Sequence, residues 1–277
     1  MTPSSQLQSQ GFLYVAFGHK HTQEAIISVA SLRKFNPDAN IAVVTDQDIG
    51  SSEFNQIIRA AAPELSGTGN YHVKIEGLRR SPFERTIFLD TDTVVCGDLT
   101  DLFPLFDKFD ILVTLNTWRV DRIFEEVCEP YSSVPKPFIA CNTGVIGFAA
   151  RPVVESLFAA WAERTRLQIV EHNETADQPS FRWAIYHSSA RFAVLSSAHN
   201  YCAFNPGVLP AYQTLAVIHD RRPLMAWYAG VINKGTSKRP RVVGPFSLRL
   251  WVAYRVYSAA GKARSARARL LRLMDWK

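Results

Sequence analysis

Short runs of large hydrophobic residues alternate with longer amphipathic segments along most of the chain. The short runs are typical of buried strands, which we expect at residues 12–17, 41–44, 87–89, 110–115 and 145–148. The amphipathic segments predict helices at residues 24–35, 53–61 and 152–167, a short helical segment at 99–106, and a short strand or the start of a helix at 71–75. The first strand, helix and strand form a βαβ unit with a right-handed crossover.

This alternation predicts an α/β protein with a Rossmann-like, mostly parallel central sheet flanked by helices. No repeat or low-complexity linker interrupts residues 11–232, so we expect one domain there. It would be preceded by a disordered segment at residues 1–10 and followed by a basic, amphipathic extension at residues 233–277.

Two aspartates directly follow the apolar run of residues 87–89. Side chains at positions i and i+2 of an extended backbone point to the same side, so Asp90 and Asp92 can direct both carboxylates to one point. Open α/β sheets bind ligands at the carboxyl ends of their strands. Hard oxygen ligands suit Mg²⁺ or Mn²⁺, so the pair predicts a divalent-cation site. The alternative is a strand end with two solvated aspartates.

The composition is that of a globular protein, with 47% hydrophobic and 20% charged residues. The four cysteines form no C-x-x-C pair, so we expect reduced thiols in a cytosolic compartment and no zinc site. The first ten residues have no basic and apolar signal-peptide pattern, and no apolar run approaches the length of a membrane span. We therefore expect a cytoplasmic protein.

The net charge of +6 is concentrated at the carboxyl end. Residues 249–277 contain eight Lys/Arg and one acidic residue, so the rest of the chain carries 31 − 8 = 23 basic and 25 − 1 = 24 acidic residues. The body is close to neutral, which argues against nucleic acid as a partner and for a local role of the tail.

Several motifs in a fixed order make the chain resemble the family 8 glycosyltransferases, the group that contains glycogenin and bacterial lipopolysaccharide galactosyl- and glucosyltransferases. The resemblance covers roughly residues 11–227. Lys74 stands 16 residues before Asp90, as a donor-contacting lysine precedes the D-x-D motif in the family. The other similar segments are V-V-T-D at 43–46, F-L-D-T-D-T-V-V at 88–95, C-N-T-G-V at 141–145, E-T-A-D-Q at 174–178 and V-I-H at 217–219.

The resemblance implies a GT-A fold and the metal-dependent transfer of a hexose, with retention of anomeric configuration, from a nucleotide-diphosphate sugar, expected to be a UDP-sugar. The metal ligands for Mn²⁺ or Mg²⁺ would be Asp90, Asp92 and His219. The donor would contact Ala16, Phe17, Gly18, His21, Asp46, Lys74, Asp90, Thr91, Asp92, Glu174, Arg221 and Arg222. The sugar subsite, where catalysis occurs, would be lined by Asn142, Asp177 and Gln178 together with Glu174. The acceptor would be a glycan or a lipid-linked sugar.

Each of these residues also has a simpler interpretation. His219 could be an ordinary strand-end histidine, and Lys74 a solvated surface lysine. Asn142 could be a turn residue before Thr143-Gly144, and Asp177 could cap a helix.

The segment after His219 departs from the family pattern H-x-x-G-x-x-K-P-W: the glycine is absent and Met225 stands in place of the lysine.

Three other functions fit parts of the sequence. Asp90-Thr91-Asp92-Thr93-Val94 matches the nucleophile motif of a D-x-D-x-T phosphatase, but that motif normally opens its domain and a later acidic pair is missing. The altered segment after His219 would suit a non-catalytic nucleotide-sugar-binding protein. Nucleic-acid binding through the tail is opposed by the neutral body.

The carboxyl-terminal segment predicts attachment to the inner face of a membrane. From about Phe246 it contains bulky aromatic and apolar residues, and beyond Gly261 apolar positions recur at helical spacing beside four arginines, namely Arg264, Arg267, Arg269 and Arg272. An apolar stripe beside basic residues suits an interfacial helix on anionic lipid. The alternative is a packing helix followed by a disordered basic end.

Overall fold

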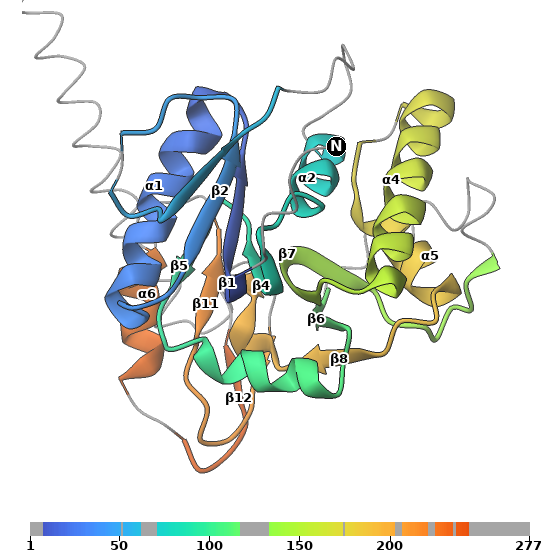
Figure 1. The fold of residues 1–277 in the computed structure, drawn as a ribbon. Coiled ribbons are helices and arrows are strands. Elements are labelled where there is room, and N and C mark those ends of the chain that lie inside the picture. Colours follow the sequence, from blue (N-terminus) through green and yellow to red (C-terminus); the bar gives the residue numbers. More distant parts are fainter. Residues whose placement is uncertain are drawn as a thin grey trace, which may run out of the picture.

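The computed structural model describes residues 8–50, 52–61, 71–116, 133–173, 175–202, 207–220, 225–234 and 237–243. Its centre is a seven-stranded sheet in the order β3-β2-β1-β4-β7-β6-β8 (Figure 1). All neighbouring strands pair in parallel except β7, which is antiparallel to both β4 and β6. The strands are β1 (Gln8–Ala16), β2 (Ile41–Thr45), β3 (Gln56–Arg59), β4 (Phe83–Leu89), β6 (Ile111–Leu115), β7 (Cys141–Ala149) and β8 (Phe192–Leu195).

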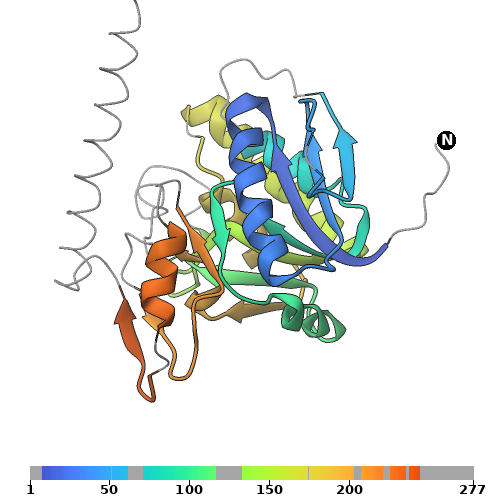
Figure 2. The same cartoon turned by 90° about the vertical axis from the view of Figure 1, so that its left-hand side faces the viewer.

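Helices cover both faces of this sheet, as Figures 1 and 2 show. On one face, α1 (Gly18–Phe35) and the 3-10 helix η1 (Thr100–Asp107) pack in one hydrophobic cluster with Phe12 and Tyr14. On the other, α2 (Tyr71–Leu78), α4 (Pro152–His172) and α5 (Gln178–His187) pack in a second cluster with Leu13. Successive residues of β1 therefore face opposite layers, which explains why a strand buried on both sides appears as a continuous apolar run.

A small second sheet stands beside the end of β4. It consists of β5 (Thr93–Val95), β11 (Val217–His219) and β9 (Tyr201–Cys202), in the order β5-β11-β9. A third hydrophobic cluster joins it to α6 (Met225–Asn233) and the 3-10 helix η3 (Ser197–His199). A two-stranded ribbon of β10 (Gly207–Leu209) and β12 (Arg241–Val243) completes the described chain.

Most of the expected elements are present, but one is of the wrong type and several differ in length. The helix expected at residues 53–61 is wrong, because residues 56–59 form β3 at the sheet edge and pair with β2. Ile57 and Ile58 are β-branched, which favours a strand. Residues 71–75 begin a helix, α2, which is one of the two expected alternatives. The strand expected at 145–148 is longer and extends from Cys141 to Ala149.

The start of β1 at Gln8 lies three residues before the expected domain boundary at residue 11.

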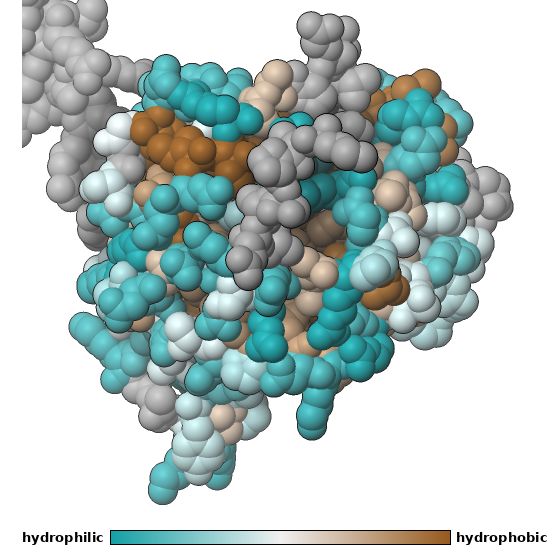
Figure 3. Space-filling model, in the orientation of Figure 1, coloured by the Kyte–Doolittle hydropathy of each residue, from teal (hydrophilic) through white to brown (hydrophobic). Residues whose placement is uncertain are grey.

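Hydrophilic residues predominate on the face shown in Figure 3, with a hydrophobic area at the upper left, near α1 and β2. Among the described helices, none is long and apolar enough to cross a membrane.

Candidate active site

Three potential metal ligands come together at the carboxyl end of β4. The ligand atoms of Asp90, Asp92 and His219 all lie within 4.8 Å of one another. His219 Nε2 lies 3.1 Å from Asp92 Oδ1 and 3.6 Å from Asp90 Oδ2. Antiparallel pairing of β11 with β5 places His219 opposite Thr93, one residue from Asp92, although more than 120 positions separate histidine and aspartate along the chain.

Backbone hydrogen bonds hold the turn that carries the two aspartates. The Asp90 amide donates to the Gly144 carbonyl at 2.8 Å, and the Thr93 hydroxyl donates to the Asp90 carbonyl at 2.8 Å. The Asp220 amide donates to the Asp92 carbonyl at 2.9 Å, which ties the residue after His219 to the same turn. Hydrogen bonds therefore join the turn that carries Asp90 and Asp92 to the segment that carries His219.

The charges at this cluster favour a cation between the ligands. Burial alone would lower the pKa of His219, but hydrogen bonds to Asp92 and Cys202 and the charges of Asp92 and Asp90 raise it well above its usual value. Burial raises the pKa of Asp90, against the lowering effect of Lys74 and His219. Two carboxylates and one imidazole are a donor set that suits Mn²⁺ or Mg²⁺ in place of the proton. The residues present thus fit a divalent cation.

Behind the Asp90–Asp92–His219 cluster, His219 packs directly on the backbone of β7. A Cβ atom added at Gly144 would stand 2.1 Å from His219 Cε1 and 2.3 Å from Nδ1, so only glycine leaves room for the imidazole. Asn142 is 6% exposed, and its Oδ1 accepts the Gly144 amide at 2.8 Å. Asn142 and Gly144 lie inside a strand, so the simple turn interpretation of Asn142 is wrong.

A buried lysine neutralises the other side of the cluster. Lys74 is 7% exposed, and its Nζ lies 3.2 Å from Asp90 Oδ1 and 3.3 Å from Asp177 Oδ2. Nζ also donates to the Thr143 hydroxyl at 3.2 Å. Burial alone would lower the pKa of Lys74, but the carboxylates of Asp177 and Asp90 raise it above its usual value. Lys74 is therefore a buried cation of the site, and its interpretation as a surface lysine is wrong.

Searches with the sequence match no protein-family model and no curated protein. The structure, however, is similar to solved glycosyltransferases. Galactosyltransferase LgtC, crystallised in complex with donor and acceptor sugar analogs, superimposes with a TM-score of 0.51 at 13% identity, over 80% of this chain and 93% of that chain. Glycosyltransferase GlyE from Streptococcus pneumoniae TIGR4 gives a TM-score of 0.55 at 13% identity, over 82% of this chain and 61% of that chain. The protein has a GT-A fold.

In this GT-A fold, Asp177 and Gln178 stand at the start of α5, and Asp177 contacts Lys74. Asp177 is 2% exposed and accepts a 2.9 Å hydrogen bond from the Thr143 hydroxyl. It occupies the N-cap position but makes no side-chain capping bond, so capping does not explain this aspartate. Gln178 Oε1 accepts a hydrogen bond of 2.5 Å from Asn116 Nδ2. Asn116 directly follows β6 and is a site neighbour that the sequence did not indicate.

The residues expected at the nucleoside end of the GT-A site gather where β1 and β2 end. Ala16 is the last residue of β1 and is fully buried, and Phe17 leads into α1. Gly18 has a φ of 75°, which favours glycine, and its amide donates to Asp46 Oδ1 at 2.8 Å. Asp46 thus holds the start of α1.

A second acidic residue joins α1 to the D-x-D turn. Glu24 Oε2 lies 3.1 Å from His21 Nδ1, and the same oxygen accepts the Thr91 hydroxyl at 3.2 Å. Glu24 has no local signal in the sequence, because its role depends on contact with a turn 67 positions away.

Glu174, Arg221 and Arg222, which the resemblance also assigns to the donor site, lie outside the described residues, as do residues 244–277.

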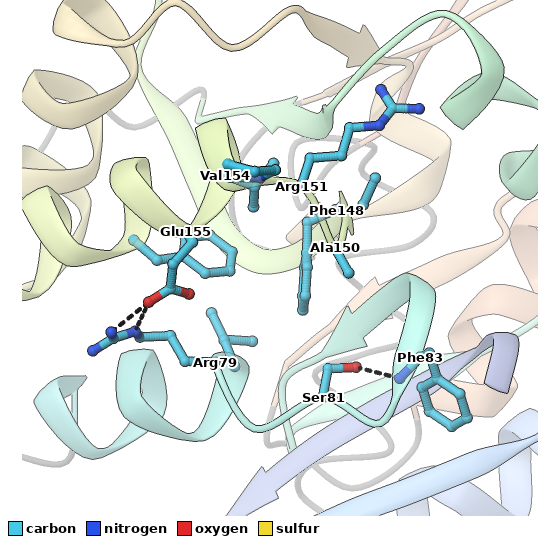
Figure 4. A pocket seen from close by; sticks show the side chains of 12 residues that line it. Arg79, Ser81, Phe83, Phe148, Ala150, Arg151, Val154 and Glu155 are labelled. Atoms are coloured by element: carbon cyan, nitrogen blue, oxygen red, sulfur yellow. Dashed lines mark hydrogen bonds and ion pairs between the residues drawn. The ribbon is translucent and has the colours of Figure 1, made fainter. Parts of the chain in front are cut away.

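A separate pocket of about 340 Å³ lies at the opposite end of β4, between α2 and α4 (Figure 4). Phe83, Phe148 and Val154 are among its apolar lining residues, and the ion pair of Arg79 with Glu155 lies at its side. It shares no residue with the Asp90–Asp92–His219 cluster.

Proposed function

We propose that this protein is a metal-dependent glycosyltransferase that moves a hexose from a nucleotide-diphosphate sugar, with uridine as the nucleoside, to a glycan or lipid-linked acceptor. One observation carries the proposal: in a GT-A fold, Asp90, Asp92 and His219 converge at the carboxyl end of β4. Ligands bind at this end of the strands in open α/β sheets. The similarity to LgtC, which was crystallised with donor and acceptor sugar analogs, supports the same class of substrate.

A bound Mn²⁺ or Mg²⁺ would be held by Asp90, Asp92 and His219, and it would neutralise charge on the departing diphosphate. Lys74 adds a fixed positive charge beside Asp90, which also stabilises a developing negative charge. Because Asp177 and Thr143 hold this ammonium group in place, little reorganisation is needed when the donor reacts. Arg221 and Arg222 are candidates for further contacts to the diphosphate by resemblance alone.

The sugar subsite is proposed to contain Asn142, Asp177 and Gln178, with Glu174. Support comes from the position of Gln178 at the start of α5, where its Oε1 meets Asn116. LgtC has also been crystallised as an active-site variant in which a glutamine is replaced by glutamate. Asp177 forms an ion pair with Lys74 and a hydrogen bond with Thr143. Its main effect on the sugar would therefore be through the position of the lysine. Retention of configuration is proposed on the family resemblance alone.

A further proposal concerns the acceptor side. Attachment of residues 246–277 to anionic lipid on the inner face of a membrane would bring the site to lipid-linked acceptors.

The main alternative function is a non-catalytic protein that binds a nucleotide sugar, and the altered segment after His219 favours it. The phosphatase alternative gains no support, because the structure has the GT-A fold.

The test of the proposed function is donor turnover. Purified protein is incubated with UDP-hexoses and Mn²⁺, and the release of UDP is measured. We expect slow donor hydrolysis that ceases with excess chelator and falls by about 100-fold or more in Asp92→Asn, since a ligand to the metal is lost. Hydrolysis that continues unchanged in chelator would contradict the metal role. Binding of a donor without any turnover would favour the non-catalytic alternative.

A further inference from the structure

Asn200, between η3 and β9, has no role in the function proposed above, yet it is bonded directly to His219. Its side chain is buried, at 5% exposure. Nδ2 donates to Asn142 Oδ1 at 2.8 Å and to the Thr114 hydroxyl at 2.9 Å. Oδ1 lies 3.1 Å from His219 Nδ1. All polar atoms of this amide are therefore engaged, and one of its bonds is to the imidazole of a proposed metal ligand.

The direction of these bonds follows from one backbone amide. The Gly144 N–H can only donate, so Asn142 Oδ1 must be the atom that accepts it. Since Asn142 Oδ1 is an acceptor, the Asn200 atom that faces it must be the amide nitrogen. The other end of the Asn200 amide, which faces His219 Nδ1, is consequently the oxygen. The reverse orientation would place two acceptors 2.8 Å apart.

An oxygen that faces Nδ1 requires a proton on that nitrogen. In a neutral imidazole the other nitrogen, Nε2, then carries the lone pair. Nε2 is the atom that faces Asp92 Oδ1 at 3.1 Å and Asp90 Oδ2 at 3.6 Å. The chain of bonds from Gly144 through Asn142 and Asn200 thus sets the ring orientation and the tautomer that a metal ligand needs.

We infer that Asn200 is a positioning residue that holds His219 with Nδ1–H bonded and Nε2 directed at the cation. This inference rests on the proposed function, because it presupposes a cation at Asp90, Asp92 and His219. Residues that accept the second ring proton of a histidine ligand orient the ring, and their loss weakens metal affinity by about 10- to 100-fold.

The test measures Mn²⁺ affinity directly, from the electron paramagnetic resonance signal of free Mn²⁺, with no substrate present. Asn200→Leu removes the acceptor, and we expect Mn²⁺ to bind about 10- to 100-fold more weakly. Asn200→Asp keeps an oxygen opposite Nδ1 but loses the donor to Asn142. We expect its Mn²⁺ affinity to stay within about threefold of that of the unaltered protein, although its melting temperature falls, as it does in Asn200→Leu.

Asn36→Leu is the matched control. Asn36 is also a buried asparagine, at 3% exposure, and its side chain bonds the backbone of Leu32, Gly97 and Leu99 away from the metal cluster. We expect a lower melting temperature and unchanged Mn²⁺ affinity in this variant.

Two results would overturn the role of Asn200. One is an Asn200→Leu variant that binds Mn²⁺ as tightly as the unaltered protein. The other is an Asn200→Asp variant that loses Mn²⁺ as fully as Asn200→Leu, because affinity would then follow stability and not the acceptor. A lack of Mn²⁺ binding by the unaltered protein would instead contradict the proposed function, so the two failures are distinguishable.

Discussion

At the scale of single residues, the sequence indicated the atoms that carry charge but not those that orient them. Asp90 and Asp92 could be found from their i, i+2 spacing after an apolar run. His219 and Lys74 could be found only through the order of motifs, since neither has a local signal. Glu24, Asn116 and Asn200 were missed, because their importance comes from contacts with side chains that lie 67, 62 and 19 positions away along the chain.

Gly144 gives a residue-scale prediction about the metal site. A methyl group at this position would stand 2.1 Å from His219 Cε1 and must displace the imidazole. We expect Gly144→Ala to weaken Mn²⁺ binding by about tenfold or more, as for other losses of ligand orientation. Gly147→Ala in the same strand is the control, since its Cβ would meet Leu112 at 2.9 Å and not the histidine. Equal Mn²⁺ affinities in the two variants would contradict this role of Gly144.

At the scale of elements, the hydrophobic pattern predicted the central strands well and the edges poorly. Strands buried on both faces, such as β1 and β2, are continuous apolar runs. The short strands β5, β9 and β11 have three residues or fewer, which is too little for a periodic signal, yet their pairing brings His219 to the aspartates. The segment of β3 fits a helix as well as a strand, because four residues at a sheet edge leave either pattern possible.

The contact of Asp110 with two arginines, where β6, β8 and α4 begin, gives an element-scale prediction about how stability depends on pH. Asp110, just before β6, accepts hydrogen bonds from the Arg191 backbone at 2.8 Å and from its guanidinium at 3.0 and 3.1 Å, and it also pairs with Arg151. Hydrogen bonds from Arg191, against the opposing effect of burial, hold the pKa of Asp110 well below its usual value. The ionised carboxylate therefore stabilises the fold above the unfolded pKa, and this contribution is lost as the pH falls towards the folded pKa.

We expect Asp110→Asn to lower the free energy of unfolding by about 2 kcal/mol at pH 7. The difference from the unaltered protein should shrink steadily as the pH falls below about 4. Urea unfolding of both proteins at pH 7, 5 and 3 measures this difference. A deficit that is the same at every pH would show that the charge of Asp110 is not its cause.

At the scale of the whole molecule, the βαβ alternation and the motif order predicted the GT-A fold, which the structural similarity to LgtC and GlyE confirms. The antiparallel strand β7 within the parallel sheet could not be predicted, because strand direction depends on the path of the connections and not on local composition. The attachment of residues from about Phe246 onward to a membrane stays a prediction, since residues 244–277 lie outside the described structure.

The tail is tested by truncation after Gly244. We expect the shortened protein to retain donor hydrolysis and to lose binding to vesicles that contain anionic lipid, because eight Lys/Arg are removed with the apolar stripe. Neutral vesicles and high salt are the controls, as the attraction is partly electrostatic. Failure of the full-length chain to bind anionic vesicles at low salt would contradict a membrane role and favour a soluble acceptor.

The central claim is that Asp90, Asp92 and His219 hold a divalent cation through which a nucleotide-diphosphate sugar binds. Calorimetric titration of UDP-hexoses into the protein, with Mn²⁺ and with chelator, tests this claim most directly. The account predicts that a UDP-hexose binds in Mn²⁺, that binding is lost in chelator, and that Asp92→Asn shows no binding in either condition. Equal affinity with and without the cation, or normal Mn²⁺-dependent binding by Asp92→Asn, would contradict it.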